Sequence, residues 1–244
     1  MARAVPEFRD EIGLPVAAGP GECMANELAA CADCGAPLPS GARFCPQCGA
    51  RVASAAAGGE RRPVAILFAD LAGFTKLTAE TDPEAVRDLL GRYFAQVDGV
   101  VVRAGGTIDK HIGDAVMGVF GAPVAYGNDS LRALRAAAGI HAAMAALSTE
   151  FGRPLFAHVG VASGEVVAAD TGSSVHRTYT VTGDAVNLAA RLDEIARAGE
   201  TVISDDVYRA CATFVEAEQV GAVPIRGLAH DVPVWKLQSL RTDA

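Results

Sequence analysis

Two stretches of this 244-residue sequence decide its fold: Phe68-Ala69-Asp70-Leu71-Ala72-Gly73-Phe74-Thr75 and Lys110-His111-Ile112-Gly113-Asp114-Ala115-Val116-Met117-Gly118-Val119-Phe120. Each is an apolar strand that ends at, or turns on, one carboxylate, Asp70 or Asp114. Two such carboxylates can hold Mg²⁺, a hard cation that prefers oxygen ligands and leaves positions open for phosphate oxygens. After Asp70 the chain passes through a glycine turn into a helix start, whose free N–H groups favour a polyphosphate. The two stretches therefore predict a metal-dependent enzyme that acts on a nucleotide.

Composition and charge exclude several classes of protein. The formal net charge is −8, so the chain is not built to coat nucleic acid or an anionic membrane. The most apolar helix expected, residues 128–151, is interrupted by Arg132, Arg135 and His141 and cannot span a membrane. Residues 1–11 lack the apolar core of a signal peptide. We therefore expect a cytoplasmic protein with neither nucleic acid nor a membrane as partner.

Four of the six cysteines form two close pairs, Cys31-x₂-Cys34 and Cys45-x₂-Cys48. A glycine follows the second cysteine of each pair, which lets backbone amides approach the thiolates. In a reducing compartment this spacing favours a metal over disulfides. Four thiolates suit tetrahedral Zn²⁺ without an open position, and hence a structural role. The alternative is four unrelated or redox cysteines. Cys211 lies in an apolar helical pattern and reads as a core residue.

The chain divides into four regions by composition. We expect a disordered segment over 1–29, a zinc ribbon over 30–50, a flexible linker over 51–62 and an α/β domain over 63–238.

Within the domain, the patterns predict strands and helices in an order that opens a ferredoxin-like α+β plan. Gly113-Asp114 and Gly164 are each expected to turn a hairpin. The strands are expected at 63–69, 107–111, 115–120, 155–163, 165–169, 178–182, 201–204, 215–220 and 232–237, and the helices at 83–103, 128–151, 184–197 and 205–212.

These motifs, in this order over residues 61–238, resemble the class III nucleotidyl cyclases, the catalytic domain of adenylyl and guanylyl cyclases. The resemblance implies that Asp70 and Asp114, with the backbone carbonyl of Leu71, bind two Mg²⁺ or Mn²⁺ ions. The ribose 3′-oxygen would then attack the α-phosphate and release pyrophosphate. Taken singly, each aspartate could instead be an ordinary turn or cap residue.

A third motif, Gly183-Asp184-Ala185-Val186-Asn187-Leu188-Ala189-Ala190-Arg191, places Asn187 and Arg191 on one helical face. The resemblance implies that Asn187 orients the ribose and that Arg191 stabilises charge on the α-phosphate. An exposed polar stripe on an amphipathic helix is the alternative.

The resemblance also implies the base and the phosphate contacts. Lys110 matches a lysine that contacts adenine in adenylyl cyclases, and Thr180 stands where those enzymes carry an Asp. This departure resembles the class IIIb branch, and a threonine hydroxyl can still accept a hydrogen bond from the adenine amino group. We expect Asp109 and His111 to be structural, since strand alternation puts them opposite Lys110. The expected contacts with the triphosphate are Gly73, Phe74, Thr75, Arg177 and Arg226.

The leading hypothesis is thus an adenylate cyclase that converts ATP to 3′,5′-cyclic AMP and pyrophosphate for intracellular signalling. The resemblance implies a head-to-tail homodimer, in which metal aspartates meet the Asn and Arg of the other chain. One alternative is a guanylate cyclase. Another is a silent cyclase-like dimerisation module whose zinc ribbon binds a protein partner or nucleic acid.

Overall fold

The computed structural model describes residues 30–31, 34–38, 45–49, 60–172, 177–224 and 231–241. The chain divides into two units, residues 1–55 and 56–244, which are taken separately below. The segment 1–29 and most of the expected linker lie outside the described residues. Strand β1 begins at Glu60, so residues 60–62 of that linker belong to the sheet instead.

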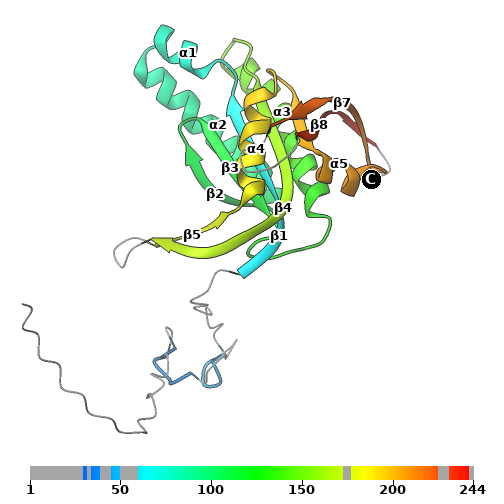
Figure 1. The fold of residues 1–244 in the computed structure, drawn as a ribbon. Helices are drawn as coiled ribbons and strands as arrows, with labels where there is room; N and C mark the ends of the chain where they lie inside the picture. The colour runs from blue at the N-terminus through cyan, green and yellow to red at the C-terminus, as the bar shows by residue number, and fades with distance from the viewer. Residues whose placement is uncertain are drawn as a thin grey trace, which may run out of the picture. The chain divides into compact units, whose positions relative to one another are not determined.

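The second unit is a mixed α+β domain, as the sequence predicts (Figure 1). Its helices are α1 (Phe74–Glu80), α2 (Pro83–Arg103), α3 (Asp129–Glu150), α4 (Asp184–Ile195) and α5 (Asp205–Cys211). Its strands are β1 (Glu60–Leu71), β2 (Thr107–Ile112), β3 (Ala115–Phe120), β4 (Ala157–Gly172), β5 (Arg177–Thr182), β6 (Thr201–Ser204), β7 (Val215–Val223) and β8 (Val232–Leu240).

The strands form one sheet in the order β2-β3-β1-β4-β6-β8-β7, and β5 pairs with β4. The first four strands in this order, β2, β3, β1 and β4, each pair antiparallel with the next. This is the ferredoxin-like arrangement of a β-α-β-β-α-β unit. Beyond them, β6 pairs in parallel with β4 and leads into the β7–β8 hairpin. The C-terminal strands thus extend the ferredoxin-like plan at one edge.

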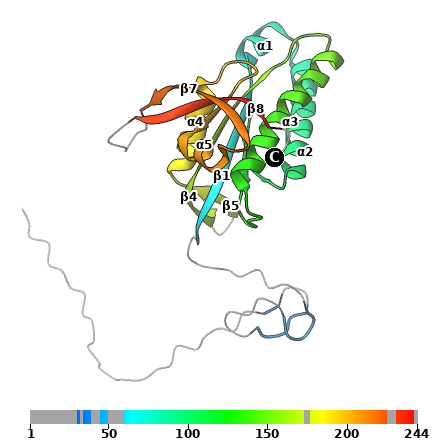
Figure 2. The same cartoon turned by 90° about the vertical axis from the view of Figure 1, so that its right-hand side faces the viewer.

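Alternate side chains of β1 enter two hydrophobic layers on opposite faces of the sheet. Leu67 and Ala69 pack with α2 and α3, whereas Ile66 and Phe68 pack with α4. Figure 2 shows α4 on one side of β1 and the pair α2 and α3 on the other. The continuous apolar run of β1 is explained by this burial on both faces. Asp70 follows the alternation of Ile66 and Phe68 and therefore belongs to the α4 face.

Helix α2 begins where the sequence predicts. The Asp82 carboxylate accepts a hydrogen bond from the backbone N–H of Glu84 at 2.8 Å, and Pro83 occupies the first turn. A proline there costs nothing because its missing N–H would have no partner inside the helix.

The hairpin expected around Gly164 is wrong, because β4 runs without a turn from Ala157 to Gly172. Gly164 lies opposite Val64 of β1 in the middle of the sheet. A Cβ atom at this position would lie 3.2 Å from the Cβ of Ala185 on α4. The glycine therefore serves close helix packing and not a turn.

Among the described residues, every helix is either too short or too polar to cross a membrane.

Candidate active site

The carboxylates of Asp70 and Asp114 meet at one edge of the domain. In the antiparallel pair of β1 and β3, Ala69 lies opposite Val116, so the next residue, Asp70, ends beside the β2–β3 turn. Gly113 makes that turn with a left-handed φ of 66°, and Asp114 follows it. Two carboxylates 44 positions apart in sequence are thereby brought into contact.

The contact changes the acidity of Asp70. Burial, together with a hydrogen bond and charge repulsion from Asp114, raises the pKa of Asp70 to about 8. A more distant repulsion from Asp193 acts in the same direction. A pair of oxygen ligands that repel each other when ionised fits a divalent cation, which favours both charged forms.

A pH dependence of stability follows for protein without divalent cations. Because the pKa of Asp70 is raised on folding, the folded chain binds more protons than the unfolded one between about pH 4 and pH 8. The free energy of unfolding should therefore decrease as the pH rises through this range. Urea titrations should show a shallower decrease for Asp70→Asn, which cannot ionise. Equal slopes for the two proteins would contradict the raised pKa.

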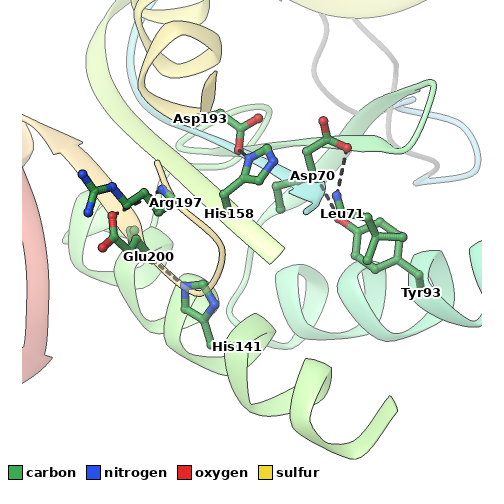
Figure 3. Close-up of polar contacts among 10 residues, drawn as sticks. Asp70, Leu71, Tyr93, His141, His158, Asp193, Arg197 and Glu200 are labelled. Carbon is green, nitrogen blue, oxygen red and sulfur yellow. Dashed lines mark hydrogen bonds and ion pairs between the residues drawn. The ribbon is translucent and has the colours of Figure 1, made fainter. Parts of the chain in front are cut away.

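The end of β1 is held by its neighbours. The backbone N–H of Leu71 donates to Asp70 Oδ1 at 2.9 Å, and the buried Tyr93 hydroxyl of α2 donates to the carbonyl of Ala69 at 2.9 Å (Figure 3). These bonds fix the backbone on both sides of the Asp70 side chain.

A buried pair that the sequence analysis missed lies beside Asp70. His158 of β4 is the register partner of Asp70. Its Nδ1 lies 3.2 Å from Oδ1 of Asp193 on α4, and Asp193 is only 5% exposed (Figure 3). The hydrogen bond to Asp193 raises the pKa of His158, and burial raises the pKa of Asp193. A signal for Asp193 was present, because it continues the buried helical spacing of Ala185, Leu188 and Leu192.

Helix α4 approaches β4 very closely at this pair. A Cβ atom at Gly160 would lie 2.3 Å from the carbonyl of Ala189 and 2.3 Å from the backbone nitrogen of Asp193. Only glycine admits this approach, which sets the position of α4 against the sheet.

Asn187 and Arg191 share the exposed face of α4, as predicted. Arg191 forms an ion pair with Glu194 of the same helix, and its side chain is 50% exposed. Within the described residues, no hydrogen bond or ion pair joins Asn187 or Arg191 to the aspartate pair. Residues two apart on a helix are rotated by about 200°, so Arg191 points away from Asp193, which faces His158. The described contacts of one chain thus include none between its own Arg191 and its own Asp70.

Lys110 and Thr180 are brought together across 70 positions of sequence. The ammonium of Lys110 on β2 donates to Oγ1 of Thr180 on β5 at 2.9 Å. The Lys110 side chain is 42% exposed, whereas Thr180 is nearly buried.

The expectation that Asp109 lies opposite Lys110 is wrong. The register of β2 against β3 shifts between Ile108 and Lys110, and such a bulge breaks the strict alternation of side chains. Oδ2 of Asp109 accepts a hydrogen bond from the Thr180 hydroxyl at 2.8 Å and lies 3.1 Å from Nζ of Lys110. His111 instead contacts α2, where it stacks on Phe94 and lies 3.0 Å from Asp98.

The expected phosphate contacts are described only in part. Gly73 has a left-handed φ of 73° and Phe74 begins α1, so the amides of Phe74 and Thr75 precede the first bond inside the helix. The backbone of Arg177 begins β5 opposite Gly172. Arg226 lies outside the described residues.

In the first unit the four cysteines converge as predicted. The Sγ atoms of Cys31, Cys34, Cys45 and Cys48 all lie within 4.8 Å of one another. Tetrahedral zinc with Zn–S bonds of about 2.3 Å requires S···S separations of about 3.8 Å, so the cluster fits zinc. Gly35 and Gly49 both have left-handed φ angles, 71° and 73°, in the two equivalent turns.

We expect one Zn²⁺ per chain, bound without being needed for folding of the second unit. Chelation should release one equivalent of zinc and leave the main thermal unfolding transition in place, because the cysteines lie outside the sheet domain. Cys211→Ala, which changes a buried cysteine of α5, should retain the zinc. A single cooperative unfolding of the whole chain on chelation would contradict this separation.

Comparisons with known proteins agree with the geometry. The family model of the adenylate and guanylate cyclase catalytic domain matches residues 58–239, and a zinc-ribbon model matches residues 31–52. The adenylyl cyclase CyaB from P. aeruginosa superposes with a TM-score of 0.72 at 30% identity, over 76% of this chain and 98% of that one. The guanylyl cyclase Cya2 gives a TM-score of 0.72 at 32% identity, over 76% and 96% of the two chains.

Among curated proteins, an uncharacterized protein of Mycobacterium tuberculosis is 36% identical over 179 residues. The match covers 72% of this chain but 32% of that protein, so this chain matches about a third of its relative's length. From Glu60 to Leu240, the fold, the aspartate pair and the family match agree. The chain belongs to the adenylate and guanylate cyclase catalytic domain family, with a zinc ribbon near its N-terminus.

Proposed function

We propose that this chain is an adenylate cyclase, which converts ATP to 3′,5′-cyclic AMP and pyrophosphate. The observation that carries the choice of base is the 2.9 Å contact between Lys110 and Thr180. It joins an ammonium donor to a hydroxyl in one small polar cluster, a combination that matches the acceptor N1 and the donor amino group of adenine.

The aspartate pair supports the metal part of this proposal. Asp70 and Asp114, with the carbonyl of Leu71, would hold two Mg²⁺ or Mn²⁺ ions. When bound, such ions make the 3′-hydroxyl a better nucleophile and neutralise the triphosphate. The chain's own part is to hold the two carboxylates in place. The bonds of Leu71 and Tyr93 fix the end of β1 at Asp70, and the turn at Gly113 places Asp114 beside it.

The remaining residues would bind and orient the nucleotide. The amides after Gly73, at Phe74 and Thr75, would receive the phosphates, together with Arg177 and Arg226. In the same proposal Asn187 orients the ribose. The Arg191 guanidinium stabilises the charge that develops on the α-phosphate, for which a planar fork of donors is well suited.

We further propose that the active unit is a head-to-tail homodimer with two equivalent sites. The support is that Asn187 and Arg191 are exposed on α4 and that, within the described residues, neither makes a hydrogen bond or ion pair with Asp70 or Asp114 of its own chain. A second chain could therefore supply the pair to each site.

The test is turnover by the purified chain with Mg²⁺ or Mn²⁺ and either ATP or GTP, with products identified by mass spectrometry. The expected result is cyclic AMP and pyrophosphate in equal amounts, with little cyclic GMP. Preferred formation of cyclic GMP would support a guanylate cyclase, to which the likeness to Cya2 also points. No product from either nucleotide would support the silent dimerisation module.

A further inference from the structure

Three polar atoms close a triangle at the junction of β2 and β5. Nζ of Lys110 lies 2.9 Å from Oγ1 of Thr180 and 3.1 Å from Oδ2 of Asp109, and the last two atoms are 2.8 Å apart. The Asp109 side chain is 4% exposed and borders a cavity of about 20 Å³ with Val119 and Val181. Asp109 thus lies behind the other two residues, and Lys110 faces the solvent.

The chemistry of the three groups fixes the direction of each hydrogen bond. An ammonium only donates and a carboxylate only accepts, so Thr180 must accept from Lys110 and donate to Asp109. The hydroxyl has a single proton, which is then committed to Asp109. Toward any further group, Thr180 can therefore offer only its remaining lone pair.

We propose that Asp109 determines which nucleotide base the site accepts. By engaging the Thr180 proton and contacting Lys110, it leaves Thr180 only as a hydrogen-bond acceptor and Lys110 only as a donor toward the base. This inference rests on the proposed function, since it concerns which nucleotide the cyclase site takes. Asp109 acts through its two neighbours and is a positioning residue.

The resulting polarity distinguishes the two purines. Adenine carries a donor amino group at C6 and an acceptor at N1, which complement the lone pair of Thr180 and the remaining proton of Lys110. Guanine carries an acceptor oxygen at C6 and an N–H at N1, so both positions are mismatched. A site whose polar groups would be left unpaired rejects the wrong ligand much more strongly than an apolar site does.

The test measures the affinity of the full chain, with Mg²⁺, for 3′-deoxy-ATP and 3′-deoxy-GTP, which lack the attacking hydroxyl and bind without turnover. Wild type should bind the adenine nucleotide more tightly. In Asp109→Ala the Thr180 hydroxyl can rotate and donate, so the ratio of the two affinities should fall about tenfold or more. Asp109→Leu, which fills more of the vacated space, carries the same expectation should the alanine variant fail to fold.

Two controls separate positioning from a structural role. Asp109→Asn keeps an acceptor oxygen and should retain most of the preference. Asp98→Ala removes the hydrogen-bond partner of His111, the residue that follows Lys110 in β2. This variant should leave the ratio of the two affinities unchanged. A merely structural Asp109 would lower both affinities alike and leave the ratio intact, which would overturn the proposal.

The remaining outcomes separate this inference from the proposed function. Tighter binding of the guanine nucleotide by wild type would overturn the assigned polarity. The expected shifts in affinity, together with no cyclic AMP from ATP, would refute the cyclase proposal and support the role of Asp109. Binding of neither nucleotide would overturn both.

Discussion

Replacing Asp70 or Asp114 by alanine should lower the rate of cyclisation at least about 1,000-fold, because metal ions stabilise the transition state by several kcal/mol. In the proposed site each carboxylate supplies a metal ligand, so both are expected to be needed. The measurement is the initial rate of cyclic AMP formation at saturating Mg²⁺ or Mn²⁺. An activity within tenfold of wild type in either variant would refute the assignment of the metal pair.

The same two variants should remain folded. In protein without divalent cations, burial and the Asp114 carboxylate raise the pKa of Asp70 to about 8, which means that the ionised pair opposes folding. Removing one member therefore relieves repulsion, and thermal unfolding at pH 8 should occur at the wild-type temperature or above it. Asp88→Ala, which alters an exposed carboxylate paired with Arg92 on α2, should change neither activity nor stability appreciably.

Mixing inactive Asp70→Ala protein with inactive Arg191→Ala protein should restore about a quarter of the wild-type activity. Random pairing makes about half of the dimers heterodimers. In a head-to-tail heterodimer both substitutions fall in one site, and the other site keeps an intact Asp70 and an intact Arg191. Half of the dimers with one of two sites working gives a quarter, provided that the sites act independently.

The orientation of α4 motivates this test. Arg191 lies on the side of the helix away from Asp193, and among the described residues its ion-pair partner is Glu194 on its own helix. The control is the mixture of Asp70→Ala with Asp114→Ala, whose lesions lie on the same half of the site. This mixture should stay inactive, because every site then lacks one metal ligand. If subunit exchange is verified and the first mixture shows no recovery, either the site lies within one chain or this protein needs a different partner.

Sequence reasoning predicted the elements whose signals are local. The Asp82-Pro83 start of α2, the Gly113-Asp114 turn and the buried strand before Asp70 all appear in the structure. It was wrong at Gly164. Glycine often makes a turn, but here the missing side chain leaves room for Ala185 of α4 to pack against the strand. Nothing in the neighbouring sequence distinguishes a glycine for a turn from a glycine for close packing.

The error at Asp109 has a related cause. Alternation along a strand assumes an unbroken ladder, but the register of β2 shifts between Ile108 and Lys110. The bulge depends on how β2 pairs with β3. Its effect is to place the Asp109 side chain against Thr180 of β5, a contact that the sequence of β2 alone does not indicate. Asp109, which alternation assigned a structural role, thereby contacts both residues of the proposed base contact.

The sequence by itself determined the aspartate pair, the cysteine cluster and the shared face of Asn187 and Arg191, since turn chemistry, short ligand spacing and helical periodicity act over a few residues. Only the tertiary structure decided the contact of Lys110 with Thr180 and that of His158 with Asp193. Lys110 and Thr180 are 70 positions apart, and β5 carries Thr180 to its place by pairing with the end of β4. His158 and Asp193 are 35 positions apart, and they meet because Gly160 lets α4 pack close to the sheet. Contacts of this kind follow from packing and strand pairing, which no local pattern of residues encodes.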